Sequence, residues 1–414
     1  MATSPLDRIW RDHWGVHALT PVVTADVGVL RSRLLELITA NPSDPLACNL
    51  SDDAGRWIPV AEEFRAAHVN SVIVASTDLD DAADPYAVMP VNRPPDDYRA
   101  PFRMVVGRRS VLLYVNHVVG DASLMTLLGS RLVRGQMVSL SDVGRRVGVR
   151  HLLRMAARQS GRHWREWIGR RRAVRALWAA ERAYAENREL ETESAASTVS
   201  VGVVLDADRY REFKVWRAAN GAGVSITALM AAAAFRAFRS EGVAVADDGL
   251  YVLVDLRRYL SPENSCLTGN LAVSVMLPTD LTDADTISRD LRALLNSAQA
   301  VPTVLKAIGI QCISVFKRTA AKGPEVRPGR VRMTFNSMLG NPGTDDIPWR
   351  DRSQARYLGM SYPIAAGGLS VFACVVDDRM EFSASFRSDL IDRETAQRAL
   401  NRLMDMPALL SATV

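Results

Sequence analysis

Hydrophobic periodicity divides the chain into alternating strand and helix segments. Short stretches of alternating or continuous apolar residues predict strands, and longer stretches with apolar residues every three or four positions predict helices. The predicted strands cover 19–27, 104–106, 110–115, 199–205, 250–254, 271–277, 331–336, 369–376 and 380–386. The predicted helices cover 29–39, 122–133, 144–189, 207–219, 227–240 and 394–403. This mixture predicts an α/β or α+β fold.

One predicted strand is apolar on both of its faces. Val111–Val115 reads Val-Leu-Leu-Tyr-Val, which is typical of a strand in the middle of a sheet. The strand runs directly into Asn116 and His117. After a short loop, the helix at 122–133 is predicted to bury one face, formed by Leu124, Leu127, Leu128 and Leu132.

The chain is long enough for two folded units. It has 414 residues, of which 48% are hydrophobic and 23% charged, so each half can bury its own core. The stretch Glu189–Thr198 is polar and acidic and has no periodicity, which predicts a linker. We therefore expect an N-terminal lobe at 1–189, a linker at 190–198 and a C-terminal lobe at 199–414.

The sequence predicts a cytoplasmic protein that acts as a monomer. Its first residues have no apolar core of the kind that a signal peptide needs. The longest nearly apolar run, Val224–Phe235, falls short of the roughly 20 residues that span a bilayer. The four cysteines are far apart and form no Cys-x-x-Cys pair, so we expect reduced thiols and no metal site.

Positive charge is concentrated in one predicted helix. The net charge is +5, and the segment 144–189 contains 13 arginines and four glutamates. This helix could be a solvated surface with Trp164, Trp167 and Trp178 packed inward. It could instead dock an acidic carrier protein or coenzyme A phosphates, or touch an anionic membrane. Nucleic-acid binding is not expected, because no basic motif with interleaved aromatic residues is present.

The segment Asn116–Ala122 reads Asn-His-Val-Val-Gly-Asp-Ala and has the residues for acid–base chemistry. A strand end holds the His117 imidazole rigidly, and an unperturbed histidine pKa of about 6.5 suits a general base. Asp121 could cap the next helix or pair with an arginine, and Gly120 would permit a sharp turn. The alternative is a structural strand–loop–helix with His117 as a hydrogen-bonded core residue.

Motifs for other chemistries are missing from the sequence. It contains no G-x-S-x-G elbow, no Walker A loop, no G-x-G-x-x-G fingerprint and no H-E-x-x-H pair. Hydrolase, nucleotide-binding and zinc-protease interpretations therefore have no sequence support.

The order of motifs resembles the CoA-dependent acyltransferase superfamily. That group includes chloramphenicol acetyltransferase, the condensation domains of nonribosomal peptide synthetases and polyketide-associated acyltransferases. His117 and Asp121 match its His-xxx-Asp motif, and Gly269-Asn270 after Val254–Leu260 matches a stretch of the second lobe. Thr334–Gly340, the hairpin at 369–387 and the final helix extend the resemblance to about 16–405. Two positions depart from the condensation-domain pattern, with Asn116 replacing the first histidine and Ala122 the final glycine.

The resemblance implies two chloramphenicol-acetyltransferase-like lobes arranged in a V, with an active-site tunnel between them. The acyl donor would be a thioester on the phosphopantetheine arm of an acyl or peptidyl carrier protein, or on coenzyme A. The acceptor would be a small molecule with an amine or hydroxyl group, as in secondary-metabolite biosynthesis. No metal and no permanently bound cofactor are expected.

The resemblance also implies roles for individual residues. His117 would act as general base or acceptor-positioning group, and Asp121 would be structural and pair with Arg257, which follows a strand of the other lobe. Asn270 would tie strands together near the tunnel. The motif residues Asn116, Gly120 and Ala122 would support the site. Two later residues, Asn336 and Ser337, could line the tunnel or serve only in strand-end hydrogen bonding.

Two further functions stay open at the level of sequence. A catalytically idle relative could act as an adaptor that binds a carrier protein or an acyl chain. A basic protein that binds DNA or a membrane is the third hypothesis, and peripheral membrane contact is not expected. The sequence favours the acyltransferase.

Overall fold

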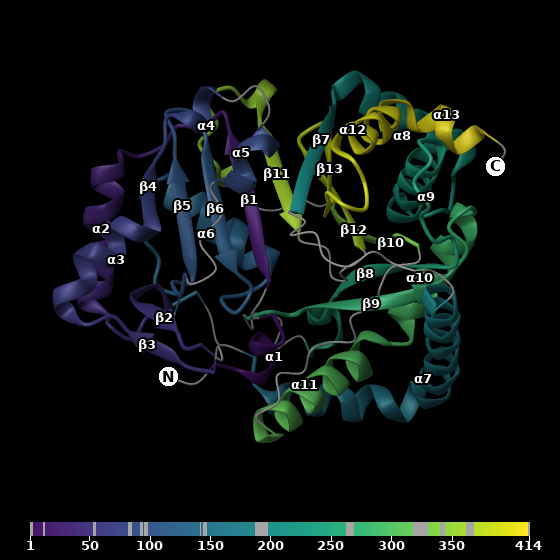
Figure 1. Ribbon diagram of the computed structural model, residues 1–414, viewed down its shortest axis with the longest axis horizontal. Coiled ribbons are helices and arrows are strands. Elements are labelled where there is room, and N and C mark those ends of the chain that lie inside the picture. Colours follow the sequence, from purple (N-terminus) through teal and green to yellow (C-terminus); the bar gives the residue numbers. More distant parts are fainter. Residues whose placement is uncertain are drawn as a thin grey trace.

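The computed structural model contains two large β-sheets that lie side by side, with helices packed around them (Figure 1). The structure describes residues 3–412 apart from 11–12, 53–54, 82–84, 92–93, 95–97, 141, 144–146, 187–197, 262–268, 318–329, 340–343 and 362–367. The predicted mixed α/β class is confirmed.

The first sheet has five strands in the order β11-β1-β6-β5-β4. Its central strand β6 is buried at all six positions, as the apolar sequence predicts. Tyr114 packs on one face of the sheet and Leu113 on the other, in separate hydrophobic clusters. The strands are β1 (Trp14–Thr20), β4 (Ile73–Ala75), β5 (Phe102–Val106), β6 (Val111–Asn116) and β11 (Arg356–Ser361).

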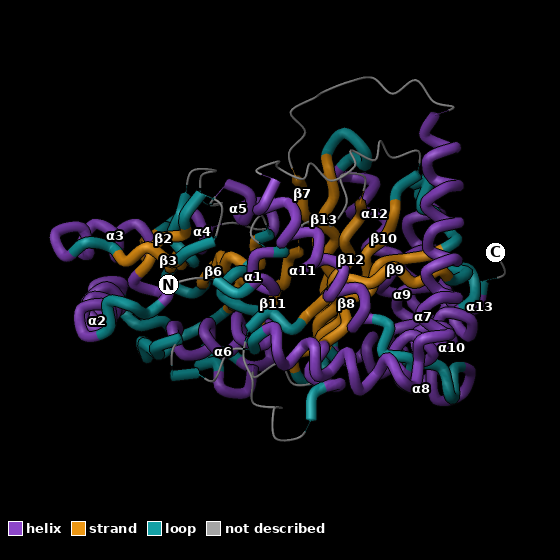
Figure 2. The backbone as a smooth tube through the Cα atoms, turned by 90° about the horizontal axis from the view of Figure 1, so that it is seen from below, coloured by secondary structure: helices purple, strands orange, loops and turns teal. Residues whose placement is uncertain are grey.

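Helices cover both faces of this sheet. Figure 2 shows α6 (Ala122–Val133) on one side of the strands and α5 (Pro85–Val91) on the other. The N-terminal half also contains α1 (Pro5–Arg8), α2 (Val27–Ala40), α3 (Arg65–Val72), α4 (Asp78–Asp81) and a small hairpin of β2 (Cys48–Leu50) with β3 (Trp57–Pro59). Leu30, Leu34 and Ile38 of α2 are fully buried and form the face of this helix that packs on the core.

Two sequence predictions in this half are wrong in detail. The strand predicted at 19–27 lies earlier, because Pro21 has no N–H for the ladder and β1 ends at Thr20. On α6, Leu127 is 38% exposed, whereas Leu124, Leu128 and Leu132 are buried. The buried stripe of this helix is therefore narrower than predicted.

The second sheet has six strands in the order β7-β13-β12-β10-β8-β9. The predicted hairpin is confirmed as β12 and β13, and Asp377 at its turn has a φ of 53°. The strands are β7 (Thr198–Leu205), β8 (Gly249–Asp255), β9 (Ala272–Pro278), β10 (Arg332–Met338), β12 (Gly368–Val376) and β13 (Arg379–Arg387).

The core helix of this half is α9 (Ile226–Ser240). The Ser225 hydroxyl accepts the Ala228 N–H at 3.1 Å and so caps the start of this helix. Small alanine side chains at Ala231–Ala234 are buried against the core and let this helix pack closely. The other helices are α7 (Val149–Glu186), α8 (Ala207–Asn220), α10 (Ala284–Asn296), α11 (Ala300–Lys317), α12 (Arg393–Arg402) and α13 (Met406–Ser411).

The later half of the chain contributes to both sheets. Strand β11 pairs with β1 in the first sheet, although it follows the predicted linker in sequence. Next to it, the buried Glu381 of β13 accepts the Tyr86 hydroxyl at 3.0 Å and forms an ion pair with Arg356 at 2.5 Å. Burial raises the pKa of Glu381, and Arg356 opposes that shift. Of the predicted linker, 190–197 lies outside the described residues and Thr198 begins β7.

Among the described residues, no single helix combines the length and the apolar character of a membrane span. Helix α10 and the first part of α11 have the length and the apolar character of a span only when they are taken together, and a 66° bend separates them.

Candidate active site

His117 follows directly on the central strand β6, and both of its backbone polar groups are fixed. Its N–H donates to the His13 carbonyl at 2.9 Å, which continues the β1–β6 pairing by one residue. Its carbonyl accepts the Asn270 side-chain amide at 3.2 Å. The Trp10 ring lies against the imidazole, with 5.4 Å between the ring centroids. Contacts from both halves of the chain therefore fix this histidine.

The His117 ring is partly exposed, and its two nitrogens differ. Nδ1 is buried and has no hydrogen-bond partner of ordinary geometry among the described residues. Nε2 faces Gly15 of β1, where an added Cβ would lie 3.5 Å from Nε2 and 2.5 Å from the Met125 sulfur. A side chain at this position would crowd both the His117 ring nitrogen and Met125, whose sulfur already lies beside Gly15.

The surroundings of His117 keep the ring neutral. Burial lowers the pKa of His117 to about 3, with smaller contributions from His13 and His17, and the Gly120 backbone opposes the shift. At neutral pH the ring therefore has one unprotonated nitrogen that can accept a hydrogen bond. With so low a pKa it is a weak base until a negative charge develops beside it.

Asn116 and Gly120 shape the loop that follows. The Asn116 side-chain oxygen accepts the Val118 N–H and its carbonyl accepts the Val119 N–H, both at 2.9 Å. This local turn gives Asn116 a structural role at the position where the resemblance places a first histidine. Gly120 is required for space, because an added Cβ would lie 2.5 Å from Leu124. Gly120 is not among the residues with positive φ, so the constraint observed at this position is crowding against Leu124.

Asp121 links the first sheet to the second half of the chain. One of its carboxylate oxygens accepts the Arg257 guanidinium at 2.7 Å and the Leu271 N–H at 3.0 Å. Arg257 lies in the 3-10 helix η3 (Leu256–Tyr259), directly after β8. The Asp121–Arg257 pair thus forms as predicted. The predicted side-chain cap of α6 does not form, because the carboxylate makes these long-range contacts instead.

The charge of Arg257 is held by two carboxylates. Burial alone would lower the pKa of Arg257, but Asp121 and then Asp255 outweigh it and raise the pKa. Asp121 is 3% exposed and Arg257 is 23% exposed at their side chains. The pair is therefore largely shielded from water.

Two consecutive residues of the second half hold both ends of the His117–Asp121 loop. Asn270 donates its side-chain amide to the His117 carbonyl, and Leu271 donates its N–H to Asp121. We call Asn270 and Leu271 the clasp. Both residues are fully buried, and the Asn270 N–H donates to Asp7 of α1 at 3.3 Å. The tying role predicted for Asn270 thus has a definite partner in the His117 backbone.

Gly269, which precedes the clasp, adopts a φ of +122°, where side chains are strained. We therefore expect Gly269→Ala to lower the free energy of unfolding by about 1–3 kcal/mol. Urea denaturation measures this loss.

Gly161→Ala is the matched control for this prediction, because Gly161 lies in α7 with no atom within 4 Å of an added Cβ. There the same replacement should stabilise the helix by up to about 1 kcal/mol. Equal effects at both positions would contradict the strain at Gly269.

A buried hydrogen-bonded chain lies beside His117. Thr126 donates its hydroxyl to the Ala122 carbonyl at 2.9 Å, so its oxygen accepts the Tyr357 hydroxyl at 2.8 Å. Tyr357 must then accept from His17 Nδ1, which lies at 2.6 Å. The remaining nitrogen, His17 Nε2, faces the Met125 sulfur at 3.4 Å.

Sequence analysis missed this chain and the role of Gly15. The signal is present, because Gly15 and His17 of β1 and His13 just before it alternate along the chain and so lie on one face. This alternation indicates a site only once β1 is known to pair with β6, because that pairing places the face beside His117.

The two residues predicted to line the tunnel lie on β10. Asn336 is buried, and the Ser337 hydroxyl lies 3.2 Å from that of Thr227 at the start of α9. Strand-end hydrogen bonding therefore accounts for Ser337. The V-shaped arrangement of the lobes and the tunnel stay predictions.

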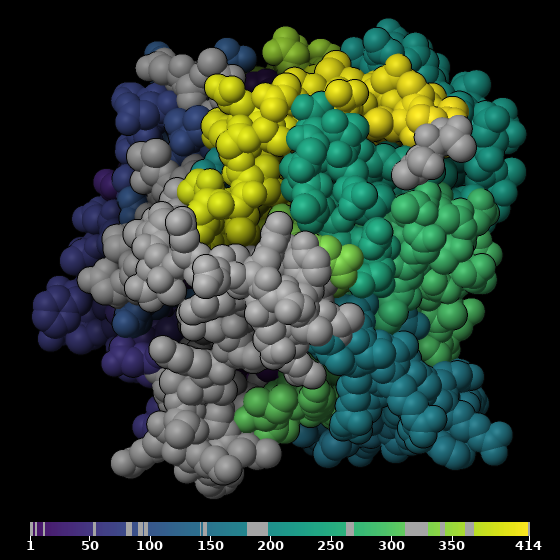
Figure 3. All heavy atoms as spheres, turned by 45° about the vertical axis from the view of Figure 1, so that its right-hand side comes forward, coloured from purple at the N-terminus to yellow at the C-terminus, as the bar shows by residue number. Residues whose placement is uncertain are grey.

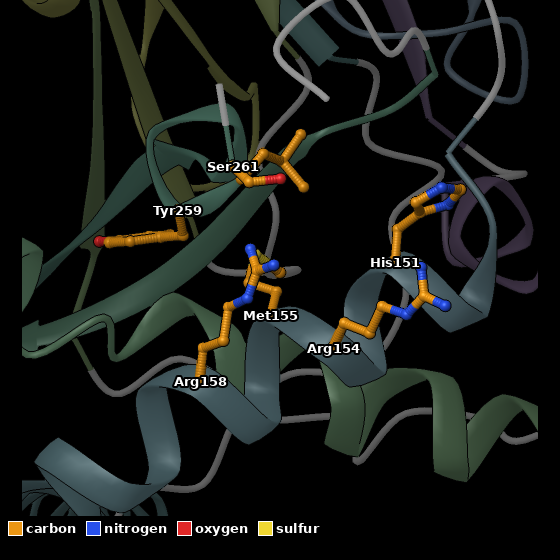
Figure 4. Close-up of a pocket in the computed structure, with 7 residues that line it drawn as sticks. His151, Arg154, Met155, Arg158, Tyr259 and Ser261 are labelled. Carbon is orange, nitrogen blue, oxygen red and sulfur yellow. The ribbon is translucent and has the colours of Figure 1, made fainter. Parts of the chain in front are cut away.

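A small basic cavity lies beside the segment that follows Arg257 in sequence. It has a volume of about 60 Å³ and lies between α7 and the segment Tyr259–Ser261. Figure 4 shows Arg158 extending from α7 toward Ser261 and Arg154 beside His151. The arginine-rich helix thus places positive charge next to the segment Tyr259–Ser261.

Comparison with known proteins finds similarity only at the level of structure. No protein-family model and no curated protein matches the sequence. TRI3 trichothecene 15-O-acetyltransferase from Fusarium sporotrichioides matches with a TM-score of 0.62 and 14% identity, over 99% of this chain and 95% of that one. The first condensation domain of the calcium-dependent antibiotic synthetase matches with a TM-score of 0.59 and 15% identity, over 100% of this chain and 98% of that one. Polyketide synthase associated protein 5 from Mycobacterium tuberculosis matches with a TM-score of 0.54 and 13% identity, over 98% of each chain.

These matches confirm the predicted fold over nearly the whole chain. It is the fold of condensation domains and related acyltransferases. A fold does not fix a reaction, which depends on the site residues.

Proposed function

We propose that the protein transfers an acyl group from a thioester to an amine or hydroxyl acceptor, with His117 at the reacting centre. The observation that carries this proposal is the neutral His117 ring, fixed at a strand end by backbone contacts from both halves of the chain. The acyltransferase-like fold supports it.

His117 Nε2 would first accept a hydrogen bond from the acceptor O–H or N–H and orient its lone pair toward the thioester carbonyl. As the new C–O or C–N bond forms, negative charge develops on the carbonyl oxygen and favours protonation of the nearby imidazole. The acceptor proton moves to Nε2. The C–S bond then breaks, and the departing sulfur takes that proton and leaves as a thiol.

The donor is proposed to be a phosphopantetheine thioester, on an acyl or peptidyl carrier protein or on coenzyme A. The positive charge of Arg154 and Arg158 supports an anionic donor, because a phosphate would be attracted to the cavity beside Tyr259–Ser261. The polyketide-associated and peptide-synthetase neighbours support a carrier protein as partner. Location in the cytoplasm stays a prediction.

The departures at Asn116 and Ala122 are compatible with this proposal. Asn116 serves the local turn, and the Ala122 carbonyl accepts the Thr126 hydroxyl. Neither contact involves the His117 ring.

The test is product formation read by intact mass. The protein is incubated with a panel of acyl-carrier and acyl-CoA thioesters and nucleophiles. We expect an acylated acceptor with the wild type and about 10²–10⁴-fold less with His117→Ala, because general-base and positioning help are lost together.

His163→Ala on α7 is the matched control, and it should leave product formation unchanged. If His117→Ala makes as much product as the wild type, His117 is not the reacting group. If the wild type and His117→Ala both make no product and bind the carrier protein equally well, the protein is the idle adaptor instead.

A further inference from the structure

A second, larger cavity lies away from the His117 motif, between α7, α11 and the edge of the second sheet. Its volume is about 610 Å³, within the range of small-molecule sites in proteins. Strands β8 and β9 form its floor, and β9 is the edge strand of the sheet. Neither His117 nor the clasp is among the residues that line it.

Aromatic side chains form one wall of this cavity. They are Trp164, Trp167 and Trp178 of α7, together with Tyr251 of β8. The Trp167 indole N–H donates to the Ser297 carbonyl at 2.6 Å, and Trp178 lies 6.3 Å from Tyr251 between ring centroids. Trp164 is 52% exposed, so the prediction that all three tryptophans pack inward is wrong for it. The tryptophans line a hollow rather than fill a core.

Basic side chains lie next to this aromatic wall. Arg170, Arg171 and Arg175 of α7 and Lys306 of α11 all line the cavity, and the described lining residues include no carboxylate. Asp290 lies near enough to Arg170 to offset part of its charge. The cavity is thus mostly apolar with a net positive charge.

Three polar atoms in the lining are buried and have no hydrogen-bond partner among the described residues. They are the Gln299 side-chain oxygen, the Ser274 hydroxyl and the Arg170 Nε. Gln299 is only 9% exposed. These atoms are shielded from water, so the class of ligand follows from the aromatic and basic side chains that line the cavity.

We propose that this cavity binds a long-chain acyl anion, in addition to the substrates of the His117 site. The chain would lie along the tryptophans and the apolar side chains Ile168, Val275 and Met276. The carboxylate or phosphate at its end would lie against the arginines of α7. Such a ligand matches both properties of the lining, its apolar surface and its positive charge. A carrier protein or a bare phosphate would not match both.

The cavity is formed by elements that reach the surface. In the space-filling view, α7 (blue) adjoins the surface formed by residues 280–310 (green), with no other described segment between them (Figure 3). Trp164 in the cavity lining is 52% exposed, so the cavity is open to solvent beside α7.

The experiment measures binding in the absence of turnover. Bromine quenches tryptophan fluorescence only at contact, so 9,10-dibromostearate should quench the wild type by way of the lining tryptophans. Calorimetry with stearate, octadecyl phosphate and octadecanol, each below its critical micelle concentration, separates the contributions of the head group and the chain. We expect both anions to bind at least tenfold more tightly than the alcohol.

Variants locate the site. Ser274→Phe fills the cavity and should weaken stearate binding at least tenfold. Arg170→Gln should weaken both anions several-fold and leave octadecanol unchanged. The matched control is Arg172→Gln, which removes an exposed arginine of the same helix that does not line the cavity and should change nothing.

Three results would overturn this proposal. They are no quenching by dibromostearate, unaltered binding by a folded Ser274→Phe variant, or binding to anionic vesicles without binding to monomeric stearate. His117→Ala should bind stearate as tightly as the wild type does. Failure of acyl transfer and failure of chain binding are therefore distinguishable.

Discussion

Asp121→Ala should lower the free energy of unfolding by about 3–5 kcal/mol, the usual loss when one partner of a buried ion pair is removed. The substitution leaves the Arg257 guanidinium without the carboxylate that lies 2.7 Å away. It also leaves the Leu271 N–H of the clasp without its acceptor. Urea denaturation of the wild type and the variant measures the loss.

A double-mutant cycle separates the ion pair from the other contacts of Asp121. Arg257→Met keeps an apolar stem and removes the charge. Because the double variant leaves no unpaired charge, it should lose less stability than the two single losses together, by at least about 1 kcal/mol. Strict additivity would contradict a direct Asp121–Arg257 interaction.

A surface pair provides the matched control for this cycle. Arg211 and Asp208 are also 2.7 Å apart, but their side chains are 66% and 81% exposed. Arg211→Met should change stability by less than about 1 kcal/mol, because water screens this pair. The contrast tests shielding from water at equal distance.

The protein should lose stability steeply as the pH falls below about 6.5, because buried histidines resist protonation. Burial lowers the pKa of His17 to about 4 and that of His117 to about 3. In the unfolded chain both titrate near 6.5, so between about pH 6 and 4 the unfolded state binds protons that the folded state does not. Unfolding is then favoured by about 1.4 kcal/mol per pH unit for each histidine.

For His17 the reason lies in its hydrogen bonds. Its Nδ1–H donates to Tyr357, so a second proton would have to enter at Nε2, against the Met125 sulfur. A thioether is a weak acceptor and stabilises an N–H poorly. His68, which is also buried, has a lowered pKa and adds to the same trend.

Urea denaturation at pH 7 and pH 5 measures this dependence. The difference in unfolding free energy between wild type and His17→Gln isolates His17 and should shrink as the pH falls. His163→Gln, in α7 outside the first sheet, should keep the full wild-type dependence. Equal stability of the wild type at both pH values would contradict buried neutral histidines.

Much of the fold was predictable because local signals agree with the tertiary structure. The apolar run Val111–Val115 could only lie in the centre of a sheet, and helix α6 begins and ends where its pattern does. The ends of β1 were not predictable from apolar residues alone. Its position depends on pairing with β6 and β11, and β11 lies more than 300 residues later in the sequence.

The candidate site was predictable in part. The His-xxx-Asp spacing and Arg257 carry their own chemical signal. Gly15 does not, because a glycine in a strand has no chemical signal until a ring nitrogen is found opposite it.

The sequence by itself determined the two kinds of layer, the central strand and the loop that presents a histidine and an aspartate. These depend on the side-chain periodicity of a few neighbouring residues. Only the tertiary structure decided what the groups do. It unites Asp121 with Arg257 and Leu271, lowers the pKa of His117 by partial burial and hollows a cavity beneath the tryptophans of α7. The reason is that pKa, pairing and empty volume depend on atoms contributed by distant segments, which no local pattern specifies.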